Sequence, residues 1–114
     1  MTIVDLARER IQANARGCLV PDDVEALTIE SRLGIEELML QLTPLAASFA
    51  MPPVSEFRVG AVVQGISGAM YLGANIEFLT CALNQTVHAE QAAVTNAAVH
   101  REASIIRLAV SAAP

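Results

Sequence analysis

A change of residue pattern at Met51-Pro52-Pro53 constrains the fold of this chain more than any other feature. Two consecutive prolines do not continue a helix, because proline lacks the amide donor and restricts the residue before it. Before this point, apolar residues recur at helical spacings, whereas the run at 58–63 is apolar and β-branched, as in a buried strand. The sequence therefore predicts a helical first part followed by a mixed α/β part.

The first part is expected to contain helices. Apolar periodicity predicts them over residues 4–15, 21–32 and 35–49. Pro21 suits the first turn of the second helix, as do the two aspartates that follow it. Pro44 lies inside the third pattern, where proline removes a backbone donor, so we expect this helix to kink or divide there. We place a domain boundary at this proline, between a helical segment, 1–43, and an α/β domain, 44–114.

The second part predicts a hairpin, a helix and a further strand. Gly65-Ile66-Ser67-Gly68 is typical of a turn between antiparallel strands at 58–63 and 69–74. An alanine-rich helix is expected from about Thr86, its N-cap, to Arg101. A strand at 105–110 then allows a parallel crossover. The fold class is α/β, with a mixed sheet flanked by helices.

Composition excludes several classes of partner. The net charge is −5, and the seven basic residues are scattered arginines without a single lysine, so a nucleic-acid partner is not expected. No apolar run approaches about 20 residues, so no membrane partner is expected. Cys18 and Cys81 are far apart and are interpreted as free thiols in a reducing, cytoplasmic compartment.

His88 and Glu90 are the first candidates for chemistry, at the expected beginning of the alanine-rich helix. Residues two apart on a regular helix point about 200° from each other, so the pair can converge only at a frayed first turn. The positive end of the helix dipole there favours anionic ligands. Alone, the pair is a weak signal, because a solvated helix end explains it equally well.

Three ordered blocks strengthen the functional interpretation. They are Ser55-Glu56-Phe57-Arg58-Val59-Gly60-Ala61, Gly73-Ala74-Asn75-Ile76-Glu77-Phe78 and Gln85-Thr86-Val87-His88-Ala89-Glu90-Gln91. Together they resemble cytidine deaminases. The helical first fifty residues, including Leu42-Thr43-Pro44-Leu45-Ala46-Ala47, resemble the N-terminal extension of the long, homodimeric bacterial type. The resemblance covers essentially the whole chain and implies a deaminase-like core and a homodimer.

The resemblance implies roles for the block that contains His88. His88 would be a zinc ligand and Glu90 the general acid/base, which does not bind the metal. Zinc lowers the pKa of water to supply a hydroxide that attacks C4 of cytosine, while the carboxylate moves protons to N3 and to the departing amine. Ala89 would contact the base through its main chain.

The other two blocks would bind the nucleoside. Asn75 and Glu77 match a ribose-binding Asn-x-Glu, in which an amide and a carboxylate donate to and accept from sugar hydroxyls. As residues alone, they are equally consistent with an ordinary polar loop. Phe57 matches an aromatic that packs against the pyrimidine, and a core anchor is the alternative.

The sequence departs from the family at its end. The family continues its third strand into Pro-Cys-x-x-Cys, whose thiolates complete the zinc site, whereas this chain reaches Pro114 first. We therefore expect a truncated core, two further zinc ligands from cysteines beyond Pro114, and no activity from the isolated chain. Three interpretations stay open: part of a deaminase that serves pyrimidine salvage with cytidine or deoxycytidine, a non-catalytic nucleoside-binding or assembly module, and an unrelated small α/β protein.

Overall fold

The computed structural model describes residues 2–13, 18–50, 57–77 and 87–113, so Cys81 and Thr86 lie outside the described residues. The helices and strands follow in the predicted order. They are α1 Ile3–Ala13, α2 Pro21–Ser31, α3 Ile35–Ala47, β1 Arg58–Gly65, β2 Met70–Ala74, α4 Ala89–Val99 and β3 Ile105–Ala113. The predicted α/β class is confirmed.

The three strands form one sheet in the order β2-β1-β3. The predicted hairpin is confirmed: β1 and β2 pair antiparallel, and Gly68 in the turn has φ 101°, a conformation that glycine adopts at no steric cost. β3 also pairs antiparallel with β1. β2 and β3 therefore run in the same direction on either side of β1, and α4 is the crossover between them. Because β2 and β3 are not neighbours, the hydrogen-bonded pairs among the described strands are all antiparallel.

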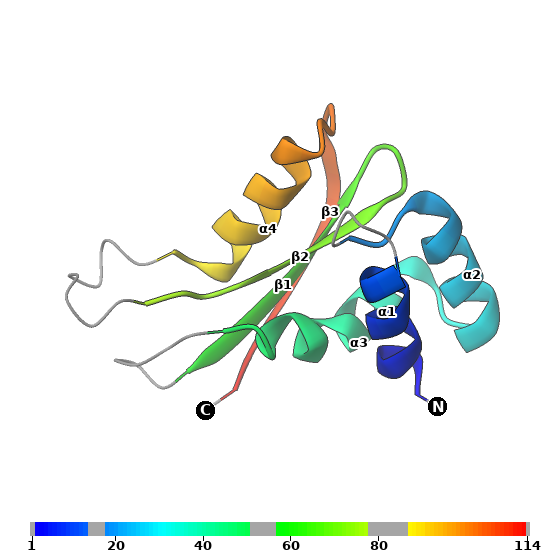
Figure 1. The fold of residues 1–114 in the computed structure, drawn as a ribbon, viewed down its shortest axis with the longest axis horizontal. Helices are drawn as coiled ribbons and strands as arrows, with labels where there is room; N and C mark the ends of the chain where they lie inside the picture. The colour runs from blue at the N-terminus through cyan, green and yellow to red at the C-terminus, as the bar shows by residue number, and fades with distance from the viewer. Residues whose placement is uncertain (1, 14–17, 51–56, 78–86, 114) are drawn as a thin grey trace.

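Helices cover both faces of this sheet, with α1, α2 and α3 on one side and α4 on the other (Figure 1). Side chains alternate along a strand, so neighbouring residues face different layers. Val62 and Met70 pack in the core beneath the first three helices. Val63 and Tyr71 pack in a second core beneath α4, with the small residues Ala89, Ala93 and Ala97.

Two glycines allow the helices to approach the strands closely. A Cβ atom at Gly60 would lie 2.0 Å from the carbonyl oxygen of Thr43 in α3. A Cβ atom at Gly73 would lie 2.2 Å from the backbone nitrogen of Ala93 in α4. Backbone atoms of a helix cannot yield as a flexible side chain does, so each glycine fixes how close its helix lies to the sheet.

α3 runs undivided from Ile35 to Ala47, so of the kink or division expected at Pro44, the division does not occur. Proline removes the amide that would bond to the carbonyl of Leu40. The Thr43 hydroxyl donates to that carbonyl at 2.8 Å and accepts from the Ser111 hydroxyl of β3 at 2.7 Å. The first bond satisfies the carbonyl that Pro44 leaves without its usual partner, and the second joins α3 to β3. Phe49, expected on the apolar face of this helix, follows its end and is 60% exposed.

The start of α4 also differs from the prediction. The helix begins at Ala89, and its N-cap is His88 rather than Thr86. Val87 is held in an antiparallel bridge with Ile76, so the helix cannot begin before it. α2, in contrast, starts at Pro21 as predicted. Its C-cap is Arg32, whose backbone adopts the left-handed conformation.

One strip of β3 is left uncovered by the described residues. Ile106, Leu108 and Val110 are each more than 40% exposed. Val110 pairs with Ala61, which lies in the core beneath α4, so the strip is on the α4 side of the sheet. α4 therefore covers β1 and β2 but leaves the outer part of this face open.

Candidate functional site

A single antiparallel bridge joins two of the predicted motifs. The backbone amide of Ile76 donates to the carbonyl of Val87, and the amide of Val87 donates back to Ile76, both at 2.9 Å. Because the bridge is antiparallel, Asn75 lies across from His88. The fold thus brings the end of β2 beside the start of α4.

His88 occupies the N-cap of α4, with φ −80° and ψ 152°. It forms a capping box with Gln91, and its backbone amide donates to Oε1 of Gln91 at 3.0 Å. His88 thus lies at the start of the helix, as predicted, but a cap holds this turn and it is not frayed. Gln91 was missed in the sequence, although its place three residues after the cap is the usual signal.

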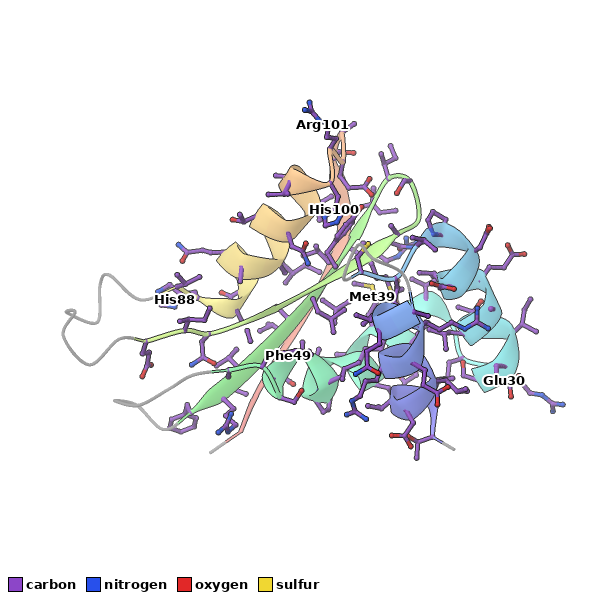
Figure 2. The ribbon with its side chains drawn as sticks, viewed as in Figure 1. Glu30, Met39, Phe49, His88, His100 and Arg101 are labelled. Atoms are coloured by element: carbon purple, nitrogen blue, oxygen red, sulfur yellow. The ribbon has the colours of Figure 1, made fainter. Side chains whose placement is uncertain are left out.

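Glu90 and Ala89 lie in the first turn of α4 beside His88. Glu90 is exposed, whereas Ala89 is buried against the sheet, where its carbonyl oxygen would lie 2.4 Å from a Cβ atom at Gly73. The imidazole and the carboxylate therefore share one end of the helix, which Figure 2 shows at the end of α4 opposite His100. Partial positive charge at this end stabilises an anion or a developing negative charge.

Asn75 is buried, with 7% of its surface exposed, and its carboxamide binds the backbone at the start of β1. Nδ2 donates to the carbonyl of Phe57 at 2.8 Å, and Oδ1 accepts from the amide of Val59 at 2.9 Å. The side chain therefore links the end of β2 to the start of β1.

Glu77 and Phe57 differ in burial. Glu77 is 7% exposed, although it carries a carboxylate. Phe57 is 51% exposed, so its ring is not a core anchor and has surface available for a ligand. The two residues follow β2 and precede β1 respectively, at the same end of the hairpin.

A second polar cluster lies at the opposite end of α4. The Tyr71 hydroxyl donates to Glu102 at 2.6 Å, and the Ser67 hydroxyl and amide donate to the same carboxylate. His100 is half-buried, with its ring centroid 5.3 Å from that of Tyr71. No pattern in the sequence indicates this cluster, because its members come from two distant segments, the hairpin and the end of α4.

This cluster borders a cavity of about 260 Å³ that Cys18 also lines. Cys18 is buried, and its thiol is not in a disulfide, as expected. Burial raises the pKa of the Tyr71 hydroxyl, and Glu102 adds to this. Burial would also raise the pKa of Glu102, but hydrogen bonds from Ser67 and Tyr71 outweigh it, and the pKa of this carboxyl is lowered.

We predict that Glu102→Gln destabilises the protein at neutral pH and that the difference from wild type shrinks in acid. A carboxyl whose folded pKa is lowered stabilises the fold above its unfolded value, near 4.5, and loses this as pH falls through the folded pKa. Urea unfolding of both proteins at pH 7 and pH 3.5 measures the effect. A constant difference between the two pH values would contradict it. Glu36→Gln, at an exposed position, is the control.

The described residues do not complete a metal site: no group of three or more His, Cys, Asp or Glu side chains among them could hold a metal ion. His88 is exposed at the helix start and has the chemistry of a zinc ligand. Nor is any described helix long and apolar enough to cross a membrane.

Comparison with known proteins matches most of the chain to one family. Residues 34–114 match the family described as the cytidine and deoxycytidylate deaminase zinc-binding region. The chain is 38% identical over 104 residues to a cytidine deaminase of Aliivibrio fischeri, covering 91% of this chain and 35% of the relative. It is 46% identical over 96 residues to one of Pectobacterium carotovorum, covering 84% and 32%.

Solved structures agree with the sequence relatives. The crystal structure of cytidine deaminase from Mycobacterium tuberculosis has a TM-score of 0.63 and 26% identity, over 68% of this chain and 61% of that one. The cytidine deaminase from Burkholderia pseudomallei has a TM-score of 0.60 and 24% identity, over 65% and 58%, which shows likeness of fold. The chain spans about a third of the length of the curated relatives it matches.

Proposed function

The chain belongs to the cytidine and deoxycytidylate deaminase family, and we propose that it forms part of a hydrolase that deaminates cytidine or deoxycytidine. The observation that carries the proposal is the Ile76–Val87 bridge. It brings the segment with Asn75 and Glu77, the proposed sugar-binding residues, beside His88 and Glu90. Binding and chemistry would then share one site at the start of α4.

The reaction replaces the amino group at C4 of cytosine by oxygen from water and yields uridine and ammonia. Glu90 would take a proton from the attacking water and deliver it to N3, and would then take the second proton from the same oxygen and deliver it to the departing amine. Its exposed position in the first turn leaves room for such transfers. The partial positive charge at the start of α4 would stabilise negative charge that develops on the substrate during the reaction.

His88 would bind zinc, with the remaining ligands supplied from outside the described residues; we propose cysteines for these. Zinc, when bound, lowers the pKa of water so that a nucleophile is available near neutral pH. The capping box with Gln91 would hold the main chain of His88 in place. Zinc is supported by the family match, which covers a zinc-binding region.

The nucleoside would be held by residues on both sides of the bridge. Glu77 would accept a hydrogen bond from a sugar hydroxyl, and Asn75 would lie at the same part of the sugar. Phe57, a residue that is 51% exposed, would pack against the pyrimidine. The main chain of Ala89 would contact the base.

The wider setting follows from the same resemblance. We propose a homodimer that acts in the cytoplasm in pyrimidine salvage, with a nucleoside as its partner and neither nucleic acid nor membrane. Within the chain, residues 1–43 would form the helical segment and 44–114 the first part of the catalytic domain.

The test is deamination by the full-length gene product. We expect ammonia release and the ultraviolet change from cytidine to uridine, loss of both after a zinc chelator, and recovery when zinc is returned. Metal analysis should find zinc in the active protein and less in a His88→Ala variant. Absence of ammonia release from the zinc-loaded protein would overturn the proposal.

A non-catalytic nucleoside-binding module is the second candidate, because the described residues alone supply no complete metal site. Calorimetry with uridine separates the two. Saturable binding without ammonia release, weakened by Glu77→Ala, would support the second candidate.

A further inference from the structure

We propose that the outer edge of β2 binds an extended segment of the same polypeptide from outside residues 1–114, by main-chain pairing with Ala74. The described sheet has the order β2-β1-β3, so β2 has a neighbouring strand on one side only. The segment would complete an interface within the full-length protein, and this role is separate from the proposed deamination.

Two isolated bridges occupy the ends of this edge. Met70 exchanges two main-chain hydrogen bonds with Leu19, at 2.8 and 3.0 Å. Ile76 exchanges two with Val87, both at 2.9 Å. Because main-chain groups point to alternate sides along a strand, every second residue between these bridges directs its amide and its carbonyl to the same edge. Those residues are Leu72 and Ala74.

The main-chain groups at this edge are only partly satisfied. The carbonyl of Leu72 accepts a hydrogen bond from Nδ2 of Asn96 in α4, at 3.3 Å. The amide of Leu72 and both main-chain groups of Ala74 have no hydrogen-bond partner among the residues that the structure describes. Ala74 is only 6% exposed, and buried main-chain amides and carbonyls are nearly always paired in native proteins. We therefore expect a partner for Ala74 from another part of the polypeptide.

An apolar groove of about 430 Å³ lies along the same edge. Ile11 of α1 and Phe49 line it on one face of the sheet, and Ala92 of α4 lines it on the other. Figure 2 shows Phe49 at the end of α3, across the sheet from α4. Phe49 is 60% exposed, so the groove offers apolar surface that the described residues do not cover.

An extended peptide has the hydrogen-bonding groups that this edge requires. Its residue opposite Ala74 would accept from the amide and donate to the carbonyl, as Leu19 and Val87 do on the same strand. Opposite residues of neighbouring strands carry their side chains on one face. Ala74 is four residues after Met70 and shares its face, beneath the first three helices. An apolar side chain at this residue would therefore enter the groove beside Phe49.

The small size of the contact favours a segment of the same polypeptide over a separate partner. Only Ala74 offers a complete main-chain pair, so the contact is far smaller than the about 1,200 Å² that a stable interface between proteins buries. A covalently linked segment has an effective concentration in the millimolar range, which makes a short contact sufficient. The chain spans 35% and 32% of two curated relatives, so a protein of their length has ample chain to supply the segment.

Photo-crosslinking of the full-length protein identifies the occupant of the groove. Phe49→p-benzoylphenylalanine places a photoreactive group there, and mass spectrometry maps the peptide to which it attaches. We expect attachment within one molecule to a peptide outside residues 1–114. Attachment only within residues 1–114, attachment to a second subunit, or no attachment would overturn the proposal. The control is Ile29→p-benzoylphenylalanine, at an exposed position of α2, which should not attach to that peptide.

Hydrogen exchange tests the pairing at Ala74 in the same protein. Ala92→Leu fills the groove from α4 and should displace the segment, so the Ala74 amide should exchange about 10-fold faster than in the wild type, or more. The amide of Gly73, which pairs with Ala61 of β1, should keep its protection. Ala98→Leu makes the same change at an exposed position of α4 and should leave both amides unchanged.

Rapid exchange of the Ala74 amide in the wild type would overturn the proposal, because a paired main-chain amide is protected. Equal exchange at Ala74 in the wild type, Ala92→Leu and Ala98→Leu would overturn it as well. Neither measurement uses deamination, so failure of the proposed function would leave both results intact.

Discussion

Glu90→Gln should lower kcat for cytidine by about 10²-fold to 10⁴-fold in the full-length protein, the usual share of a general acid/base. Glutamine has nearly the same shape but cannot take up a proton from water and release it to N3 or to the amine. Glu90 is exposed in the first turn of α4, so the substitution leaves the core unchanged. Loss of its charge from the helix start costs only about 0.3–1 kcal/mol of stability. Uridine formation at saturating cytidine and a thermal melt measure the two effects.

Glu37→Gln is the matched control for this prediction. Glu37 is an exposed carboxylate in the first turn of α3, so the change removes the same charge from the first turn of another helix. It should leave kcat unchanged with a similar small change in melting temperature. If Glu90→Gln also kept kcat within about 2-fold of wild type, the carboxylate would have no part in proton transfer, since such a group accounts for far more.

Features governed by neighbouring residues could be predicted from the sequence. Pro21 with its two following aspartates marks the start of α2, and Gly68 supplies the positive φ of the hairpin turn. Both signals are local, because helix starts and tight turns depend on a few adjacent residues. The order of helices and strands followed from these signals and from periodicity.

The errors arose where distant residues meet. Pro44 predicts a break, but Ser111 and Thr43 bond across 68 positions of sequence and satisfy the carbonyl that the proline leaves. The start of α4 moved to Ala89 because Ile76 holds Val87 in a bridge. Neither contact has a pattern in the sequence.

The candidate site divides in the same way. Its motifs could be found from their resemblance to those of cytidine deaminases. Their proximity at the start of α4 is consistent with that resemblance. The sequence could not show that the carboxamide of Asn75 also binds the backbone at the start of β1, because the residues that it binds lie 16 and 18 positions away. The bonds of Asn75 to Phe57 and Val59 became visible only once β1 and β2 were paired.

Gly73→Ala should destabilise the protein by about 3 kcal/mol, at the upper end of the usual range for overpacking. The new Cβ would lie 2.2 Å from the backbone nitrogen of Ala93 and 2.4 Å from the carbonyl oxygen of Ala89. Both atoms belong to the main chain of α4, so the whole helix must move. Urea unfolding at pH 7 measures the loss, with Gly34→Ala as the control, because a Cβ at Gly34 meets no atom within 4 Å.

The same substitution also connects packing to chemistry. Ala89 is the first residue of α4, so a helix that moves away from β2 takes His88 and Glu90 with it. Catalysis is sensitive to displacements of about 1 Å, so kcat should fall about 10²-fold even in the fraction that remains folded. Gly34→Ala should leave kcat unchanged and cost less than about 1 kcal/mol, since Gly34 is the N-cap of α3 in an extended conformation. Equal stability and equal kcat for the two variants would show that α4 is not held against the sheet at Gly73.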